Sequence, residues 1–156
     1  GIVGAMSIPL QDFSRGESEQ KPLAVAGTLV AVNICYEDAF GEEIRAQLPA
    51  ATLLVNVSNV AWFGRSIAPP QHLQISQARA IETGRYMVRA TNTGMTAVIN
   101  PQGIVEHVAE PYTTAVLSAT VRGFEGVTPF VTYGNVPILL LCVAVLGIPL
   151  VIARRA

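Results

Sequence analysis

The sequence carries little charge and few cysteines, and both shortages exclude classes of function. Charged residues make up 13% of the 156 residues, and the formal net charge is −1, whereas ordinary domains carry about 25% charged residues. A chain without a basic excess lacks the electrostatic footprint of nucleic-acid binding, so we expect no nucleic-acid partner. Its two cysteines, Cys35 and Cys142, form no C-x-x-C pair and no disulfide framework. We therefore predict no metal site and no cofactor.

Hydrophobic residues, in contrast, make up 51% of the chain. Residues 136–153 read "VPILLLCVAVLGIPLVIA", without a charge, and Arg154 and Arg155 follow. As a helix this run would be about 27 Å long, close to the hydrocarbon thickness of a bilayer. It predicts a transmembrane helix, with residues 154–156 as a cytoplasmic tail by the positive-inside rule. The alternative is a buried helix of a soluble domain.

The rest of the chain alternates between strand-like and helix-like segments. Short apolar runs rich in β-branched residues predict strands at 29–34, 52–57, 86–91, 96–99, 104–108 and 115–121. Helical composition predicts helices at 38–48 and 71–84, the second ended by Gly84. Residues 1–27 and 59–70 are expected to be loops. This order predicts a layered α/β fold with buried strands.

One cysteine stands where a nucleophile is often presented. In "VNICYEDAF" the predicted strand ends at Ile34, and Cys35 opens the turn toward the next helix. Such a turn exposes a side chain and aims a helix N-terminus at it. The N–H of Tyr36 would donate into an oxyanion hole. Glu37 has the same sign of charge as a thiolate and cannot activate it by charge. The alternative is a small buried thiol, which is the more common kind of cysteine at the end of a buried strand.

Other candidate residues have alternatives of their own. His72 is a candidate base for Cys35 or a structural histidine. Trp62 is either a loop anchor or a wall of an apolar pocket. The arginines Arg79, Arg85 and Arg89 are interpreted as solvated or ion-paired, with phosphate contact as the alternative.

The order of several separated motifs is more specific. "ICYED" is followed by "VNVSNVAWFGRSIAPPQHLQISQARAIETGRYMVRATNTGMTAVINPQG" and by "GVTPFVTYGN" before the apolar run. From about Asp12 onward this combination resembles the last third of the apolipoprotein N-acyltransferases, bacterial inner-membrane enzymes with a nitrilase-like periplasmic domain.

The resemblance implies a nitrilase-like αββα sandwich, present here in part, and a Glu–Lys–Cys triad. Cys35 matches the nucleophile, and Tyr36 and Glu37 match the residues required beside it. Trp62 matches a loop residue that handles substrate, and Phe63 and Asn59 are assigned to substrate binding with it. The implied reaction moves an acyl chain from a phospholipid, through a Cys thioester, to the N-terminal diacylglyceryl-cysteine of an apolipoprotein. The implied state is a monomer.

The resemblance also implies a division of the chain. Residues 1–135 would be the C-terminal part of the catalytic domain, on the periplasmic side, and 136–153 the transmembrane helix. The triad Glu and Lys would lie upstream of Gly1, so we expect the isolated chain to be an inactive fragment. Val60 stands where the family usually has Asp, which weakens the Trp62 assignment. The competing interpretations are a membrane-tethered nitrilase-like amidase and an inactive membrane-anchored fragment.

Overall fold

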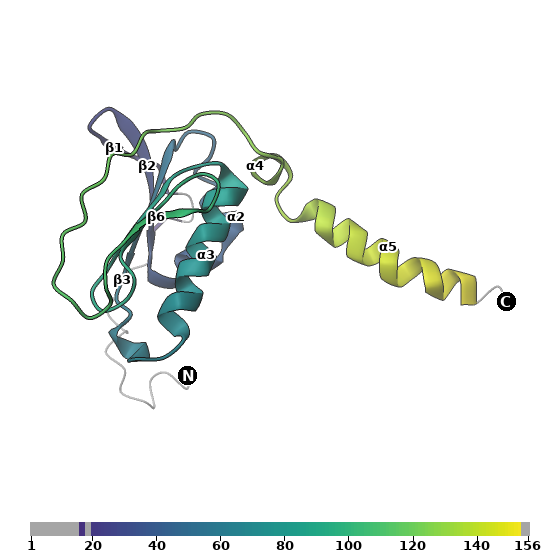
Figure 1. The fold of residues 1–156 in the computed structure, drawn as a ribbon. Helices are drawn as coiled ribbons and strands as arrows, with labels where there is room; N and C mark the ends of the chain where they lie inside the picture. The colour runs from purple at the N-terminus through teal and green to yellow at the C-terminus, as the bar shows by residue number, and fades with distance from the viewer. Residues whose placement is uncertain (1–15, 18–19, 154–156) are drawn as a thin grey trace.

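A computed structural model describes residues 16–17 and 20–153 of the protein. Side chains are described as far as residue 148. Its strands form one six-stranded sheet in chain order (Figure 1). They are β1 (Leu23–Val25), β2 (Thr28–Ile34), β3 (Leu53–Ser58), β4 (Met87–Thr91), β5 (Ala97–Ile99) and β6 (Val105–Val108). The helices are η1 (Cys35–Ala39), α2 (Gly41–Arg45), η2 (Ala61–Phe63), α3 (Ala68–Thr83), α4 (Pro129–Tyr133) and α5 (Val136–Ala153), where η denotes a 3₁₀ helix.

The centre of the sheet is parallel and its margins are antiparallel. β2, β3 and β4 run in the same direction, while β1, β5 and β6 pair antiparallel with their neighbours. The connections β2–β3 and β3–β4 carry helices, as parallel pairing requires. Because the three central strands are parallel, their carboxyl ends meet at one edge of the sheet. In α/β sheets this edge is where ligands usually bind.

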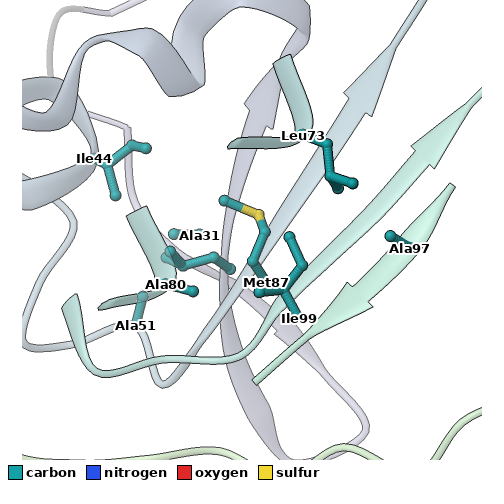
Figure 2. Packing of buried hydrophobic residues seen from close by; sticks show 9 residues of the cluster. Ala31, Ile44, Ala51, Leu73, Ala80, Met87, Ala97 and Ile99 are labelled. Carbon is teal, nitrogen blue, oxygen red and sulfur yellow. The ribbon is translucent and has the colours of Figure 1, made fainter. Parts of the chain in front are cut away.

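The helices α2 and α3 pack on one face of this sheet, where side chains of alternate strand residues meet them. Figure 2 shows the resulting hydrophobic cluster, to which α2 contributes Ile44, α3 contributes Leu73 and β4 contributes Met87. Its members are Ala31, Ile44, Ala51, Leu54, Leu73, Ala80, Met87, Ala97 and Ile99. The small residues allow the helices to approach the strands closely.

Strand register places two rows of residues on this helix-covered face. Ala31, Leu54 and Met87 are neighbours across β2, β3 and β4, and they belong to the hydrophobic cluster. Two residues further along each strand, Asn33, Asn56 and Arg89 are neighbours in the same way. All three of these polar residues are buried. This second row, Asn33–Asn56–Arg89, is called the polar row below, and it lies one step closer to the carboxyl edge.

Most predicted strands and the long helix are confirmed with small shifts at their ends. α3 begins at Ala68 and is followed by Gly84, which has a left-handed φ of 64° and donates its N–H to carbonyls of the last turn. The helix predicted over 38–48 is confirmed only for Gly41–Arg45, because the backbone breaks at Phe40 (ψ 84°) between η1 and this five-residue α2. The predicted loop 1–27 contains β1, and the predicted loop 59–70 contains η2 and the start of α3.

The predicted strand at 115–121 is also wrong. These residues, all of them described, run without a strand partner along the outside of the molecule. Val116 is 94% exposed, so the β-branched composition there has no core to cover. Farther on, the segment is fixed to the sheet where the N–H of Phe124 donates to the carbonyl of Thr52 at 2.9 Å.

The helix predicted at 136–153 is present as α5, which projects away from the sheet (Figure 1). Within the described residues, however, no helix has both the length and the apolarity needed to cross a membrane. The prediction of a transmembrane segment is thus not confirmed. The predicted cytoplasmic tail, 154–156, lies outside the described residues.

Two hydrogen bonds connect α2 to α4 and to Asn135, the residue before α5. The N–H of Asn135 donates to a carboxylate oxygen of Glu42 at 2.8 Å, and Arg45 donates to the carbonyl of Val131 at 3.3 Å. The bond from Asn135 and the ion pair with Arg45 hold the pKa of Glu42 below its usual value.

Candidate active site

Cys35 lies at the carboxyl edge of the sheet, at the first residue after β2. Its φ is 54°, in the left-handed region that side chains other than glycine rarely adopt. Backbone strain of this kind costs about 1–3 kcal/mol and persists only where surrounding contacts fix it. Strained residues cluster at active sites. This geometry favours the interpretation of Cys35 as a presented nucleophile over that of an ordinary core thiol.

The turn that carries Cys35 is closed by Glu37. A carboxylate oxygen of Glu37 accepts the N–H of Ile34 at 2.6 Å, across the base of the turn. Tyr36 is 60% exposed, and its ring meets that of Phe40 edge-to-face at 5.6 Å. Glu37 therefore shapes the turn, and Tyr36 forms part of its outer surface.

A pocket of about 220 Å³ opens beside the thiol. It is lined, next to Cys35, by Tyr36, Phe63, Ala68, Gln71, His72 and Ile75. Apart from Gln71 and His72, these side chains offer mainly carbon surface. The pocket is therefore suited to an apolar group attached to the atom that the thiol would attack.

The predicted substrate-binding residues fall into two groups. Phe63 lines the pocket, and the carbonyl of Asn59 lies 3.9 Å from the Cys35 sulfur, which donates to it. Trp62 is 84% exposed and does not line the pocket. The structure thus brings Phe63 and Asn59 to Cys35 and leaves Trp62 on the outer surface of the loop.

The Trp62 loop is held by two asparagines. The Asn59 amide oxygen accepts from the N–H of Ala61 and from the amide of Asn92 at 2.7 Å. Asn92 in turn accepts the N–H of Val60 at 3.1 Å. Val60, where the family resemblance leads one to expect Asp, is buried. Hydrogen bonds from Asn92 and burial of Val60 therefore hold this loop without the expected carboxylate.

Beneath the turn lies a buried ionic network that sequence reasoning missed. Asp38, fully buried in η1, contacts the His72 ring nitrogen Nε2 at 2.7 Å and accepts from Ser76 Oγ at 2.6 Å. Arg89 Nη1 donates to Asp38 at 3.2 Å. His72 therefore lines the Cys35 pocket with its ring already bonded to Asp38, and the structure shows no bond from it to the thiol.

The same network reaches the backbone of Cys35 from β3. Arg89 Nη1 also donates to the Asn56 amide oxygen at 3.2 Å, and Asn56 Nδ2 donates to the carbonyl of Cys35 at 2.9 Å. Burial holds the pKa of Arg89 below its ordinary value, and the neighbouring carboxylate of Asp38 opposes that shift. An arginine remains protonated in proteins, so the network carries a permanent positive charge under the turn.

The prediction that the arginines are solvated or ion-paired is confirmed by pairing for Arg79 and Arg89, and it is wrong for Arg85. Arg89 is 1% exposed and ion-paired, and Arg85 is 2% exposed and donates to carbonyls such as those of Ala51 and Gly126. Arg79 pairs with Glu82, as the alternative of pairing predicted. A sequence signal existed, because Asn56 and Arg89 are polar residues within strands predicted to be buried.

Comparisons with known proteins place the sequence among related proteins. Residues 7–123 match the carbon-nitrogen hydrolase family. An apolipoprotein N-acyltransferase of Nitrosomonas europaea is 64% identical over 86% of this chain, and one of Chromobacterium violaceum is 51% identical over 99% of it. These alignments take in 27% and 31% of the relatives, so the chain spans less than a third of their length.

Solved structures of the same family have the same fold. A carbon-nitrogen hydrolase of Helicobacter pylori, 15% identical, has a TM-score of 0.57 over 64% of this chain and 42% of its own. An amidase from a Nesterenkonia species, 26% identical, has a TM-score of 0.51 over 64% and 42%. Its structure shows acrylamide added at the active-site cysteine. From its sequence match over residues 7–123 and this shared nitrilase-like α/β fold, the chain belongs to the carbon-nitrogen hydrolase family.

Proposed function

We propose that the protein of which this chain is part transfers a fatty acyl chain from a phospholipid to the N-terminal amine of a diacylglyceryl-cysteine on an apolipoprotein. The observation that carries the proposal is Cys35, held in a left-handed turn at the mouth of an apolar pocket. The names of the relatives support the choice of reaction.

The first step forms a thioester on Cys35. The thiolate attacks the ester carbonyl of the phospholipid, the new S–C bond forms, and the ester C–O bond breaks. The departing glycerol oxygen takes up a proton and leaves as a lysophospholipid. The proposed roles of the neighbours follow from their positions: Glu37 holds the turn, Tyr36 and Phe63 flank the bound chain, and the Asn59 carbonyl lies beside the sulfur.

The second step releases the acyl group to an amine. The α-amino nitrogen attacks the thioester, an amide N–C bond forms, the S–C bond breaks, and the amine loses a proton as the thiolate returns. The family resemblance assigns proton transfer to a Glu and a Lys that it matches to no residue of 1–156. An apolar pocket excludes water, which would otherwise hydrolyse the thioester, as in an amidase.

The test uses the full-length gene in bacteria depleted of their own N-acyltransferase. We expect mass spectrometry of lipoprotein N-termini to show triacylated cysteine. Termini that stay diacylated, with free fatty acid released instead, would favour the amidase and refute the proposal.

We further propose that this reaction takes place at the bacterial inner membrane, with the catalytic part on the periplasmic side and α5 lying against lipid. The large hydrophobic side chains described in α5 are more than half exposed in the structure, among them Leu140 and Leu146. Exposed apolar area is unfavourable in water by roughly 25 cal/mol per Å². Contact with acyl chains would remove that cost.

Membrane contact predicts a difference between two chain lengths. The 156-residue chain should float with vesicles that contain phosphatidylethanolamine, whereas a chain ending at residue 135 should remain in the dense fractions of the gradient. Removing α5 takes away the exposed apolar surface but leaves β1 to β6. Equal flotation of the two chains, or of neither, would contradict a lipid contact through α5.

The exposed Trp62 is predicted to matter for turnover and not for stability. Replacing Trp62 with alanine removes a side chain with little burial, so the unfolding free energy should change by no more than about 0.5 kcal/mol. An aromatic anchor at a binding surface contributes more than about 1 kcal/mol, so kcat/KM should fall roughly tenfold. The assay is acyl transfer from phosphatidylethanolamine to a diacylglyceryl-cysteine peptide by the full-length protein.

The matched control for Trp62 is Tyr133→Ala. Tyr133 is also an exposed aromatic, but it lies in α4 and does not line the Cys35 pocket. We expect its replacement to leave kcat/KM within about twofold. Equal losses in the two variants would show that Trp62 has no particular role in substrate binding.

A further inference from the structure

Arg89 lies beneath the turn of Cys35, and a single nitrogen of its side chain makes all the hydrogen bonds that the side chain forms with the described residues. Nη1 donates to Asp38 Oδ2 at 3.2 Å, to Asn56 Oδ1 at 3.2 Å and to Ser76 Oγ at 2.7 Å. Nε and Nη2, also buried, have no partner among the described residues. Nη1 of Arg89 is therefore the atom at which acceptors from three elements, η1, β3 and α3, meet.

That point joins both sides of the turn. On one side Asn56, fixed by Arg89 and by Ser58 Oγ at 2.6 Å, donates to the carbonyl of Cys35 itself. On the other side Asp38 lies three residues after Cys35 in the same 3₁₀ helix, and Ser76 connects it to α3. Without Nη1, neither the amide nor the carboxylate would be held in place by charge.

We infer that Arg89 is the positioning residue of the nucleophile, acting through Asn56 and Asp38 to keep the Cys35 backbone in its left-handed conformation. The importance of Arg89 for catalysis rests on the proposed function, whereas the effect of Arg89 on the Cys35 backbone does not. Cys35 would relax to a negative φ if its surroundings did not fix it. Relaxation would turn the thiol away from the pocket mouth, and no contact of Arg89 with substrate is needed for this effect.

The test measures how fast Cys35 reacts with iodoacetamide in the 156-residue chain. The background is Cys142→Ser, which leaves Cys35 as the only thiol. In Arg89→Met the second-order rate should fall about tenfold, the scale on which small misplacements of a reacting group act. Asn56→Ala should show a similar loss. The double variant should lose no more than the larger single loss, since coupled residues are not additive.

A second buried arginine provides the matched control. Arg85 is as buried as Arg89, but it donates to backbone carbonyls remote from Cys35. Arg85→Met should lower the melting temperature as Arg89→Met does, yet leave the alkylation rate within about twofold. Rescue should come from Arg89→Lys, because an ammonium offers three donors and a positive charge at one atom.

Several outcomes would overturn the inference. They are an unchanged alkylation rate in folded Arg89→Met, an equal loss in Arg85→Met, no rescue by lysine, or multiplying losses in the double variant. If Arg89→Met does not fold, the alkylation rates of Asn56→Ala and Arg89→Lys are compared with that of the parent. An unchanged rate in Asn56→Ala, or a large loss in Arg89→Lys, would then overturn the inference. Alkylation needs no phospholipid, lipoprotein or upstream residue. A failed acyltransferase assay would therefore leave this result intact, and the reverse also holds.

Discussion

Replacement of Cys35 with serine in the full-length protein is expected to abolish triacylation of lipoprotein N-termini. A hydroxyl is a far weaker nucleophile than a thiolate at neutral pH, and no second thiol lies in the pocket. Loss of the nucleophile in covalent catalysis lowers the rate by at least roughly 10³-fold. The measurement is mass spectrometry of the N-termini in depleted cells that carry the variant gene.

The second cysteine is the control for this substitution. Cys142 lies exposed on α5, so Cys142→Ser should leave the amount of triacylated product within about twofold of the parent. Both variants must be present in equal amounts, as checked by immunoblotting. Continued triacylation by the Cys35→Ser variant would refute the thioester mechanism.

Replacement of Asp38 with alanine is expected to cause the largest loss of stability. Asp38 is the counter-ion of Arg89, and both side chains are buried. Removing one partner of a buried ion pair leaves an uncompensated charge, at a cost of about 3–5 kcal/mol. Domains are stable by only about 5–15 kcal/mol. In urea unfolding of the 156-residue chain, the midpoint should fall by roughly 2 M for a slope of about 2 kcal/mol/M.

An exposed carboxylate gives the comparison. Glu106 is exposed on β6 and accepts hydrogen bonds from Asn100 and Tyr86. Glu106→Ala should change the unfolding free energy by no more than about 0.5 kcal/mol. Should Asp38→Ala cost as little, the pair with Arg89 would be shown to contribute no more than a surface contact.

The parts of the fold with strong local signals were predictable. β2 and β3 are mostly apolar runs rich in β-branched residues, and α3 ends at a glycine that adopts a left-handed φ. Neither 3₁₀ helix was predicted, because their short turns depend on tertiary contacts such as those of Asp38. Val116 was placed in a strand because composition does not reveal whether a neighbouring strand is available.

The sequence indicated where along the chain the site lies, but it did not indicate how the side chains of the site are arranged. The turn after β2 indicated Cys35, and the motif order indicated Trp62, Phe63 and Asn59. Nothing in the spacing of Asp38, His72 and Arg89 shows that they meet, since the separations of 34 and 51 residues have no period. Only the register of parallel strands places Arg89 beside Asn56.

The polar row has a further consequence, for the accuracy of strand pairing. A slip of two residues between β3 and β4 would keep every side chain on its own face, so hydrophobic alternation cannot reject it. In such a misaligned sheet Arg89 would face Leu54 or Ser58 in place of Asn56, its neighbour in the correct alignment. The guanidinium would then lie apart from Asp38, at a cost of several kcal/mol. The buried charge of Arg89 thereby makes the misaligned pairing of β3 and β4 less stable than the correct one.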